Sequence, residues 1–114
     1  MTPSEIIADL DAALRDAGET ITVRRYTVPA DTPRTTTDID GVPAAVRALK
    51  AEELVGPINQ TWSRVVLSPT LLAPLLPLVK GDKVVVQGRE RNVEFMQPFA
   101  VQSVLVRIEL LVSG

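Results

Sequence analysis

The chain has no cysteine and no histidine. The absence of cysteine excludes disulfides, thiolate nucleophiles and thiolate metal ligands, and it fits a reducing cytoplasm. The absence of histidine removes the usual general base at neutral pH and the commonest zinc ligand, so a Ser-His-Asp or Cys-His arrangement cannot be built. Catalysis would have to rest on carboxylates or lysines, and no convergent motif of either kind is present. The sequence therefore predicts a protein that is not an enzyme, with no catalytic residue, no cofactor and no metal site.

Aromatic residues are also few, and neither sign of charge is in large excess. One tryptophan, one tyrosine and two phenylalanines are too few for a base-stacking platform. Twelve basic and 14 acidic residues give a net charge of -2, and the basic residues are scattered, so no nucleic-acid footprint is present. The longest apolar run is broken by prolines, and the first residues lack the order of a signal peptide. We expect a soluble protein with no membrane partner, made in a cytoplasm.

The length of 114 residues indicates a single domain over residues 1–114. Near the start, Thr2 is a good helix cap, Pro3 suits the first helical position, and Glu5 completes a capping box. Apolar residues then recur at helical spacing until Gly18, which is a suitable stop. The sequence predicts one helix over about residues 3–17.

Most of the remaining chain predicts strands. Residues 19–28 and 62–68 are rich in threonine, valine and other strand formers, although a slip of the apolar phase at Arg24 and Arg25 suggests a bulge. Residues 100–112 predict a last strand, and its apolar face consists of Val104, Val106, Ile108, Leu110 and Val112.

Residues 80–95, KGDKVVVQGRERNVEF, fit either a phosphate-binding loop or a β-hairpin. A phosphate loop needs Gly-Lys-Ser/Thr opening a helix, whereas Gly81 is followed by Asp82 and then by valines. We therefore predict a hairpin, in which Val93 and Phe95 continue the alternation after a polar tip over residues 87–92. The tip is either a solvated turn or an interface contact formed by Arg89, Glu90 and Arg91.

Two polar or ambiguous segments separate these strands. Residues 29–41 combine two prolines, four threonines and three aspartates, which predicts a long loop and a candidate contact arm. Its Asp38-Ile39-Asp40-Gly41 stretch lacks the further ligand positions of a calcium loop, so a turn is favoured. Residues 42–54 favour a helix by propensity, although alternating apolar residues also fit a strand.

A proline-leucine segment follows residue 68. Proline at positions 69, 74 and 77 excludes a helix or a central strand, so its leucines lie on an extended segment. Two interpretations stay open: a loop that covers the core, or an exposed apolar strip that awaits a partner. The leucines concerned include Leu71, Leu72, Leu75 and Leu76.

From about Gly41 to the end, the order and spacing of several short stretches resemble the small head-tail joining, or head-completion, proteins of long-tailed bacteriophages. Trp62 and the proline-leucine segment depart from that pattern, which puts the layer of the phage neck in doubt. The matching stretches are Val46, Glu53-Leu54-Val55-Gly56, Ile58-Asn59-Gln60, Val65-Val66-Leu67-Ser68, Lys80-Gly81-Asp82-Lys83-Val84, Gly88, Val93 and Val106-Arg107-Ile108-Glu109-Leu110.

The resemblance implies a mainly β fold: a small β-barrel or β-sandwich over about residues 20–113, with one N-terminal helix and long contact loops. It also implies that residues 42–50 form a strand, against their propensity. The implied function is that of a structural virion protein made in the host bacterial cytoplasm. It would form a hexameric ring at the neck that closes the DNA-filled head and joins it to the tail.

The implied partners are other copies of the chain, the portal or adaptor protein, and the tail-terminator or tail-tube protein, while packaged DNA passes through without specific binding. An adaptor layer, expected to be dodecameric, and a tail-terminator layer are alternatives within the neck. A cytoplasmic protein-binding module and a carboxylate-based hydrolase or transferase are alternatives from other classes. The predicted protein-interface residues are Thr35, Thr36, Thr37, Asp38, Asp40, Leu71, Leu72, Leu75, Leu76, Arg89, Glu90 and Arg91.

Overall fold

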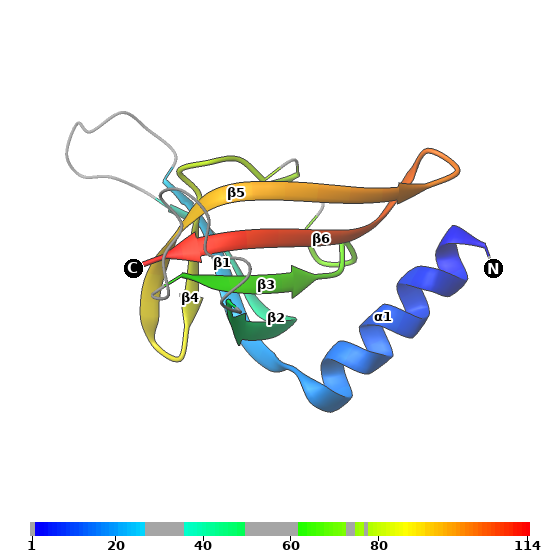
Figure 1. The fold of residues 1–114 in the computed structure, drawn as a ribbon, viewed down its shortest axis with the longest axis horizontal. Coiled ribbons are helices and arrows are strands. Elements are labelled where there is room, and N and C mark those ends of the chain that lie inside the picture. The colour runs from blue at the N-terminus through cyan, green and yellow to red at the C-terminus, as the bar shows by residue number, and fades with distance from the viewer. Residues whose placement is uncertain (1, 27–35, 50–61, 73–74, 77) are drawn as a thin grey trace.

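The computed structural model describes residues 2–26, 36–49, 62–72, 75–76 and 78–114. Six antiparallel strands close into a barrel in the order β1-β2-β3-β6-β5-β4, and one helix precedes them (Figure 1). The prediction of a mainly β fold with one N-terminal helix is confirmed, and the sheet is a closed barrel, not a sandwich. The elements are α1 (Pro3–Ala17), β1 (Glu19–Tyr26), β2 (Thr36–Ala48), β3 (Ser63–Leu67), β4 (Lys83–Val86), β5 (Arg89–Val101) and β6 (Val104–Ser113).

The helix begins and ends at the predicted residues. The Thr2 hydroxyl accepts a hydrogen bond from the Glu5 N–H (3.2 Å), and the Glu5 carboxylate accepts one from the Thr2 N–H (3.1 Å), which completes the capping box. At the other end, a Cβ on Gly18 would lie 2.3 Å from the Ala44 carbonyl oxygen, so glycine is required by this close approach of α1 and β2. No helix among the described residues is long and apolar enough to span a membrane.

Alternate residues of the strands point into the barrel. Along β6, Val106, Ile108, Leu110 and Val112 are all buried, as predicted, although Val104 before them is exposed. Each such side chain contributes roughly 1.5–3 kcal/mol through the apolar area it removes from water. The largest fully buried members of the core come from all six strands and from two leucines between β3 and β4: Ile21, Val23, Val42, Val65, Leu67, Leu72, Leu78, Val84, Val93, Ile108, Leu110 and Val112.

The predicted loop over residues 29–41 is wrong for its second half. Residues 36–41 belong to β2, and residues 36–39 pair with β1, with Asp38 opposite Arg24, while residues 29–35 lie outside the described part of the chain. The segment suggests a loop because Thr37, Asp38 and Asp40 are polar and exposed, whereas Ile39 packs against the core. The same strand continues to Ala48, so the strand implied for residues 42–50 is confirmed to that point and the helix propensity is overridden.

The predicted bulge at Arg24 and Arg25 is also wrong. Both residues pair with β2 in register, and the irregularity lies between Ile21 and Val23, where β2 has one extra residue. Gly41 lies in that extra stretch and has a φ of 69°, a left-handed conformation that glycine adopts without steric cost.

The hairpin over residues 80–95 is confirmed, but its turn is shorter than expected. Only Gln87 and Gly88 form it, and both have positive φ (52° and 78°), as a two-residue turn of the primed kind requires. Arg89, Glu90 and Arg91 therefore lie in β5 and not at a tip. Strand pairing begins there because the turn conformation matches the twist of the flanking strands.

The predicted last strand over residues 100–112 is interrupted by a second tight turn. Gln102 and Ser103 both have positive φ, so residues 100 and 101 end β5 and β6 begins at Val104. No glycine marks this turn, which is why the sequence pattern does not reveal it. Pairing of β6 with β3 covers residues 108–112, whereas its pairing with β5 runs on to residue 104, so the two strands extend beyond the barrel as a ribbon (Figure 1).

Candidate interaction surface

One side of the barrel wall, here called the polar face, carries Arg24, Tyr26, Asp38 and Glu90. Arg24 donates to both oxygens of Asp38 (3.0 and 3.1 Å) and to Glu90 (2.9 Å), and the Tyr26 hydroxyl donates to Glu90 (2.8 Å). The bonds to Asp38 and then to Glu90 raise the pKa of Arg24, and the bond from Tyr26 lowers the pKa of Glu90. The charges of this face are therefore paired within the chain.

A second ion pair lies under the rim of the barrel. Asp82 is 2% exposed and accepts two hydrogen bonds of 2.8 Å from Arg25, which raises the pKa of that guanidinium. Arg25 also donates to the Leu75 carbonyl (3.0 Å), and Asp82 accepts from the Val79 N–H (2.9 Å). Asp82 thus ties the proline-leucine segment to β1, a role that sequence reasoning missed because Gly-Asp before a strand is a common pattern.

These bonds, together with the burial of the leucines, distinguish between a loop that covers the core and an exposed apolar strip. Leu72 and Leu75 are buried in the core, and Leu76 is half-buried against it, so the exposed apolar strip is wrong for these three residues. Leu71 alone of the four predicted contacts is exposed. The segment covers the core because short-range bonds, such as that from the Leu75 N–H to the Leu72 carbonyl, satisfy its backbone.

The other predicted contacts fall in several places. Thr35 lies outside the described residues, and Thr36 belongs to β2. Asp40, also on β2, accepts a hydrogen bond from the Thr22 hydroxyl (2.9 Å), while Arg91 donates to Ser63 (2.8 Å) and its burial lowers its pKa. The structure brings only some of them together: Asp38 and Glu90 share Arg24, with Thr37 next to Asp38 on the same strand and Arg89 next to Glu90. As an interface they stay a prediction.

The opposite side of the wall, formed by the outer surfaces of β3, β6 and β5, differs in character. We call it the aromatic face and define it by Trp62, Arg64, Phe95, Phe99 and Arg107. Phe95 and Phe99 are 52% and 38% exposed, and the Trp62 and Phe95 rings lie 6.2 Å apart at 40°. The Arg107 guanidinium lies 5.8 Å from the centre of the Phe99 ring, directly across the ribbon.

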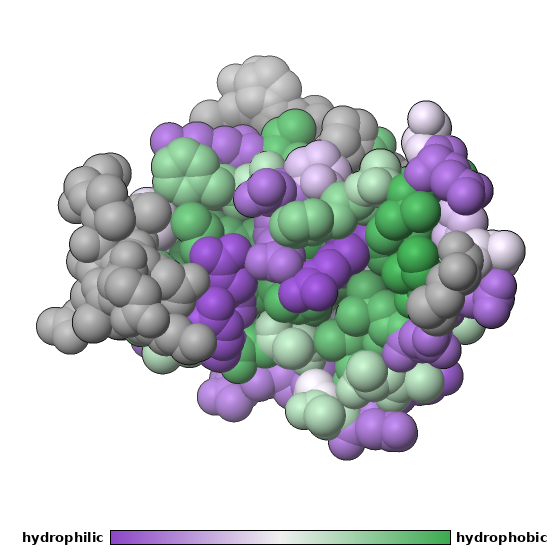
Figure 2. All heavy atoms as spheres, turned by 45° about the vertical axis from the view of Figure 1, so that its right-hand side comes forward, coloured by the Kyte–Doolittle hydropathy of each residue, from purple (hydrophilic) through white to green (hydrophobic). Residues whose placement is uncertain are grey.

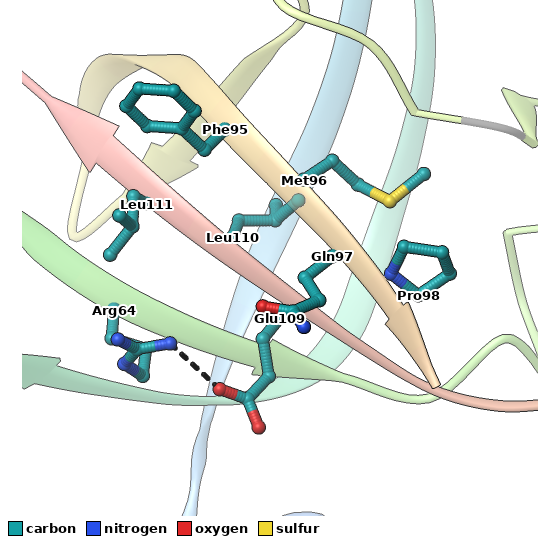
Figure 3. Close-up of a pocket in the computed structure, with 8 residues that line it drawn as sticks. All are labelled: Arg64, Phe95, Met96, Gln97, Pro98, Glu109, Leu110 and Leu111. Carbon is teal, nitrogen blue, oxygen red and sulfur yellow. Dashed lines mark hydrogen bonds and ion pairs between the residues drawn. The ribbon is translucent and has the colours of Figure 1, made fainter. Parts of the chain in front are cut away.

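A pocket of about 390 Å³ opens in this face (Figure 3). On one side Arg64 reaches from β3 to a carboxylate oxygen of Glu109 on β6 (2.8 Å), as the dashed line shows, and Arg107 bonds the other oxygen (2.8 Å). One carboxylate is thus shared by two arginines, and the cluster of Arg64, Glu109 and Arg107 has a net positive charge. The side chains that line it are Arg64, Phe95, Met96, Gln97, Pro98, Glu109, Leu110 and Leu111.

Exposed hydrophobic residues gather on β5 and β6. Phe95, Phe99 and Val104 lie there, whereas the other large exposed ones, Leu71 and Val79, lie elsewhere in the described chain. Figure 2, which brings the ribbon end of the molecule forward, shows hydrophobic side chains on its right-hand part beside a band of hydrophilic ones. Aromatic residues next to arginine, around a hollow in a rigid wall, are typical of protein contact surfaces.

Sequence reasoning missed this surface because of one extra residue. Val93 and Phe95 were expected on the same face, but β5 advances two residues between them while β6 advances one. This bulge at Glu94 turns Phe95 outward, although Val93 is buried. The available signal was the spacing of Phe95, Gln97 and Phe99, which places both rings on one side of a strand.

Within the described residues, no group of three or more Asp or Glu side chains could hold a metal ion. A comparison with models of known protein families finds none that matches the chain. A comparison with curated proteins finds no match either. The assignment of function therefore depends on the surfaces themselves and on the resemblance noted in the sequence.

Proposed function

We propose that the chain is a structural virion protein of the neck of a long-tailed bacteriophage. It forms a ring that closes the DNA-filled head and joins it to the tail. The observation that supports the proposal is the aromatic face, where exposed rings lie beside arginine as is typical of protein contact surfaces, on a barrel in a chain that resembles head-completion proteins. No enzymatic role is part of the proposal.

The architecture suits a ring subunit. Each copy in a ring meets two side neighbours through two different patches, and it also meets axial partners above and below. A closed barrel holds such patches rigidly, because each strand is paired on both sides around the wall. The partners are further copies in a hexameric ring, the portal or adaptor protein on the head side, and the tail-terminator or tail-tube protein on the other.

The proposal is tested by electron microscopy of a lysate from the source element with this gene deleted. We expect DNA-filled or emptied heads and finished tails that remain separate, and joined particles when the wild-type gene is supplied in trans. Intact particles from the deletion would overturn the proposal. A dodecameric ring bound to the portal would instead indicate the adaptor layer.

A further inference from the structure

The aromatic face has an unusual balance of charge. Residues 95–108 contain no carboxylate, and their only charged residue is Arg107, whose side chain is 45% exposed. Arg64 adds a second positive charge, and Glu109, the one carboxylate between them, is bound to both arginines. The face is therefore apolar and positively charged, and it favours a partner that offers carboxylates beside small or apolar side chains.

The outer side of α1 has the opposite character. Glu5, Asp9, Ala12 and Asp16 are all exposed, and their spacing of four, three and four residues places them along one side of the helix. We call this row the acidic stripe. Hydrogen bonds from Thr2 lower the pKa of Glu5, which keeps that carboxylate ionised. Leu14 lies on the other side of the helix and is buried against the barrel.

The two surfaces are different, complementary and exposed in the same copy. A contact between two different patches of one protein repeats from copy to copy, and it closes into a ring when the rotation allows it. The short side chain of Ala12 in the acidic stripe lets an aromatic surface approach the helix closely, while the carboxylates meet Arg64 and Arg107.

We infer that the aromatic face binds the acidic stripe of α1 from the neighbouring copy in the ring. The inference rests on the proposed function, since it names the lateral partner within that ring. Charge complementarity commits the face to a second copy of this chain, and an axial partner is the outcome that the experiment must separate from it.

The test uses cysteine pairs, because the natural chain has none. A gene with Ala12→Cys and Gln97→Cys is supplied to the deletion, particles are isolated, and a short bismaleimide is added before denaturing electrophoresis. Both positions are exposed, so the substitutions should not disturb the fold. We expect a ladder of covalent multimers up to the full ring, because links within one copy do not join chains.

The matched control pairs Ala12→Cys with Arg89→Cys, which is exposed at the opposite end of β5. We expect monomers from this control and from each single variant, apart from chance dimers. Joined particles without a ladder from the first pair would overturn the inference and leave the proposed function standing. A ladder from the control pair would overturn it too, in favour of a contact near Arg89.

Charge reversal gives a second readout that does not need a reactive thiol. Arg107→Glu alone and Asp9→Arg alone should each lower the yield of joined particles by about tenfold or more, because each places like charges opposite one another. The two changes together should recover most of that loss. A double variant no better than the worse single variant would contradict the pairing, provided that each purified variant melts cooperatively.

Discussion

The polar face and the aromatic face lie on the same barrel wall, but the side chains of the polar face bind one another, whereas the rings of the aromatic face are exposed. Arg24, Asp38 and Glu90 bind one another, so covering them with a partner would desolvate charges that are already paired. Phe95 and Phe99 leave ring surface in water, so covering them stabilises a complex by up to roughly 1.5–3 kcal/mol each. The difference indicates that the polar face supports the fold and the aromatic face is available for binding.

The strongest way to test this division is to compare an inward residue with an outward one on the paired strands β5 and β6. Ile108→Asp buries a carboxylate in the core, and the cost of several kcal/mol is comparable to the whole stability of a small domain. We expect an unfolded or insoluble protein. Phe99→Asp, in the neighbouring strand, should remain folded because its side chain lies in solvent near Arg107. Circular dichroism and urea denaturation distinguish the two variants. A folded Ile108→Asp variant would contradict the placement of Ile108 inside the barrel.

The next largest loss of stability is expected when the ion pair of Arg25 and Asp82 is removed. Asp82→Ala leaves Arg25 without its two short hydrogen bonds and frees the Val79 N–H, so we expect a loss of about 2–3 kcal/mol in the free energy of unfolding. The lower end is favoured because the Arg25 side chain is 32% exposed. Asp40→Ala, which removes one exposed hydrogen bond, is the matched control and should cost at most about 0.5 kcal/mol. Equal losses would mean that Asp82 does not tie down the leucine segment.

The sequence predicts the regular parts of this fold well. The capping box of Thr2 and Glu5 defines the helix, and the alternation of Ile108 with Leu110 and Val112 defines the inner face of β6. Both signals are local, since each depends on residues within a few positions of one another. The hairpin around Gly88 follows for the same reason.

The sequence predictions that were wrong concern parts of the fold that depend on pairing between strands. The polar run in β2 becomes a strand because Arg24 and Thr22 of β1 bind its aspartates, and no local pattern contains that information. The turn at Gln102 and Ser103 lacks glycine, and the bulge at Glu94 reverses the orientation of Phe95 by a single residue. The candidate site is therefore harder to predict than the fold, because it exists only after that bulge is known.

A smaller effect concerns the pH dependence of the polar face. The hydrogen bond from Tyr26 lowers the pKa of Glu90 below the ordinary value of a glutamate, so the contribution of Glu90 to stability is complete above that ordinary value and is lost as the pH falls through the folded pKa. From about pH 5 to about pH 3, the wild type should lose up to about 1 kcal/mol more than Glu90→Gln, since the pair is partly exposed. Tyr26→Phe removes the largest cause and should shrink this difference. Urea denaturation at each pH measures it, and parallel curves for all three proteins would contradict the bonding seen here.

Substitutions of the two exposed rings should change stability little and assembly clearly. Phe95→Ser and Phe99→Ser remove exposed rings, so each should alter the free energy of unfolding by less than about 1 kcal/mol, including the loss of the Arg107 contact at Phe99. Each should nevertheless reduce joined particles, because a partner would no longer cover an aromatic side chain. Val79→Ser is the matched control, since Val79 is also a large exposed hydrophobic residue, at 49%, and lies away from the aromatic face. If all three variants assembled like the wild type, exposure of the two rings would be incidental, and the polar face would become the better candidate for contact despite its paired charges.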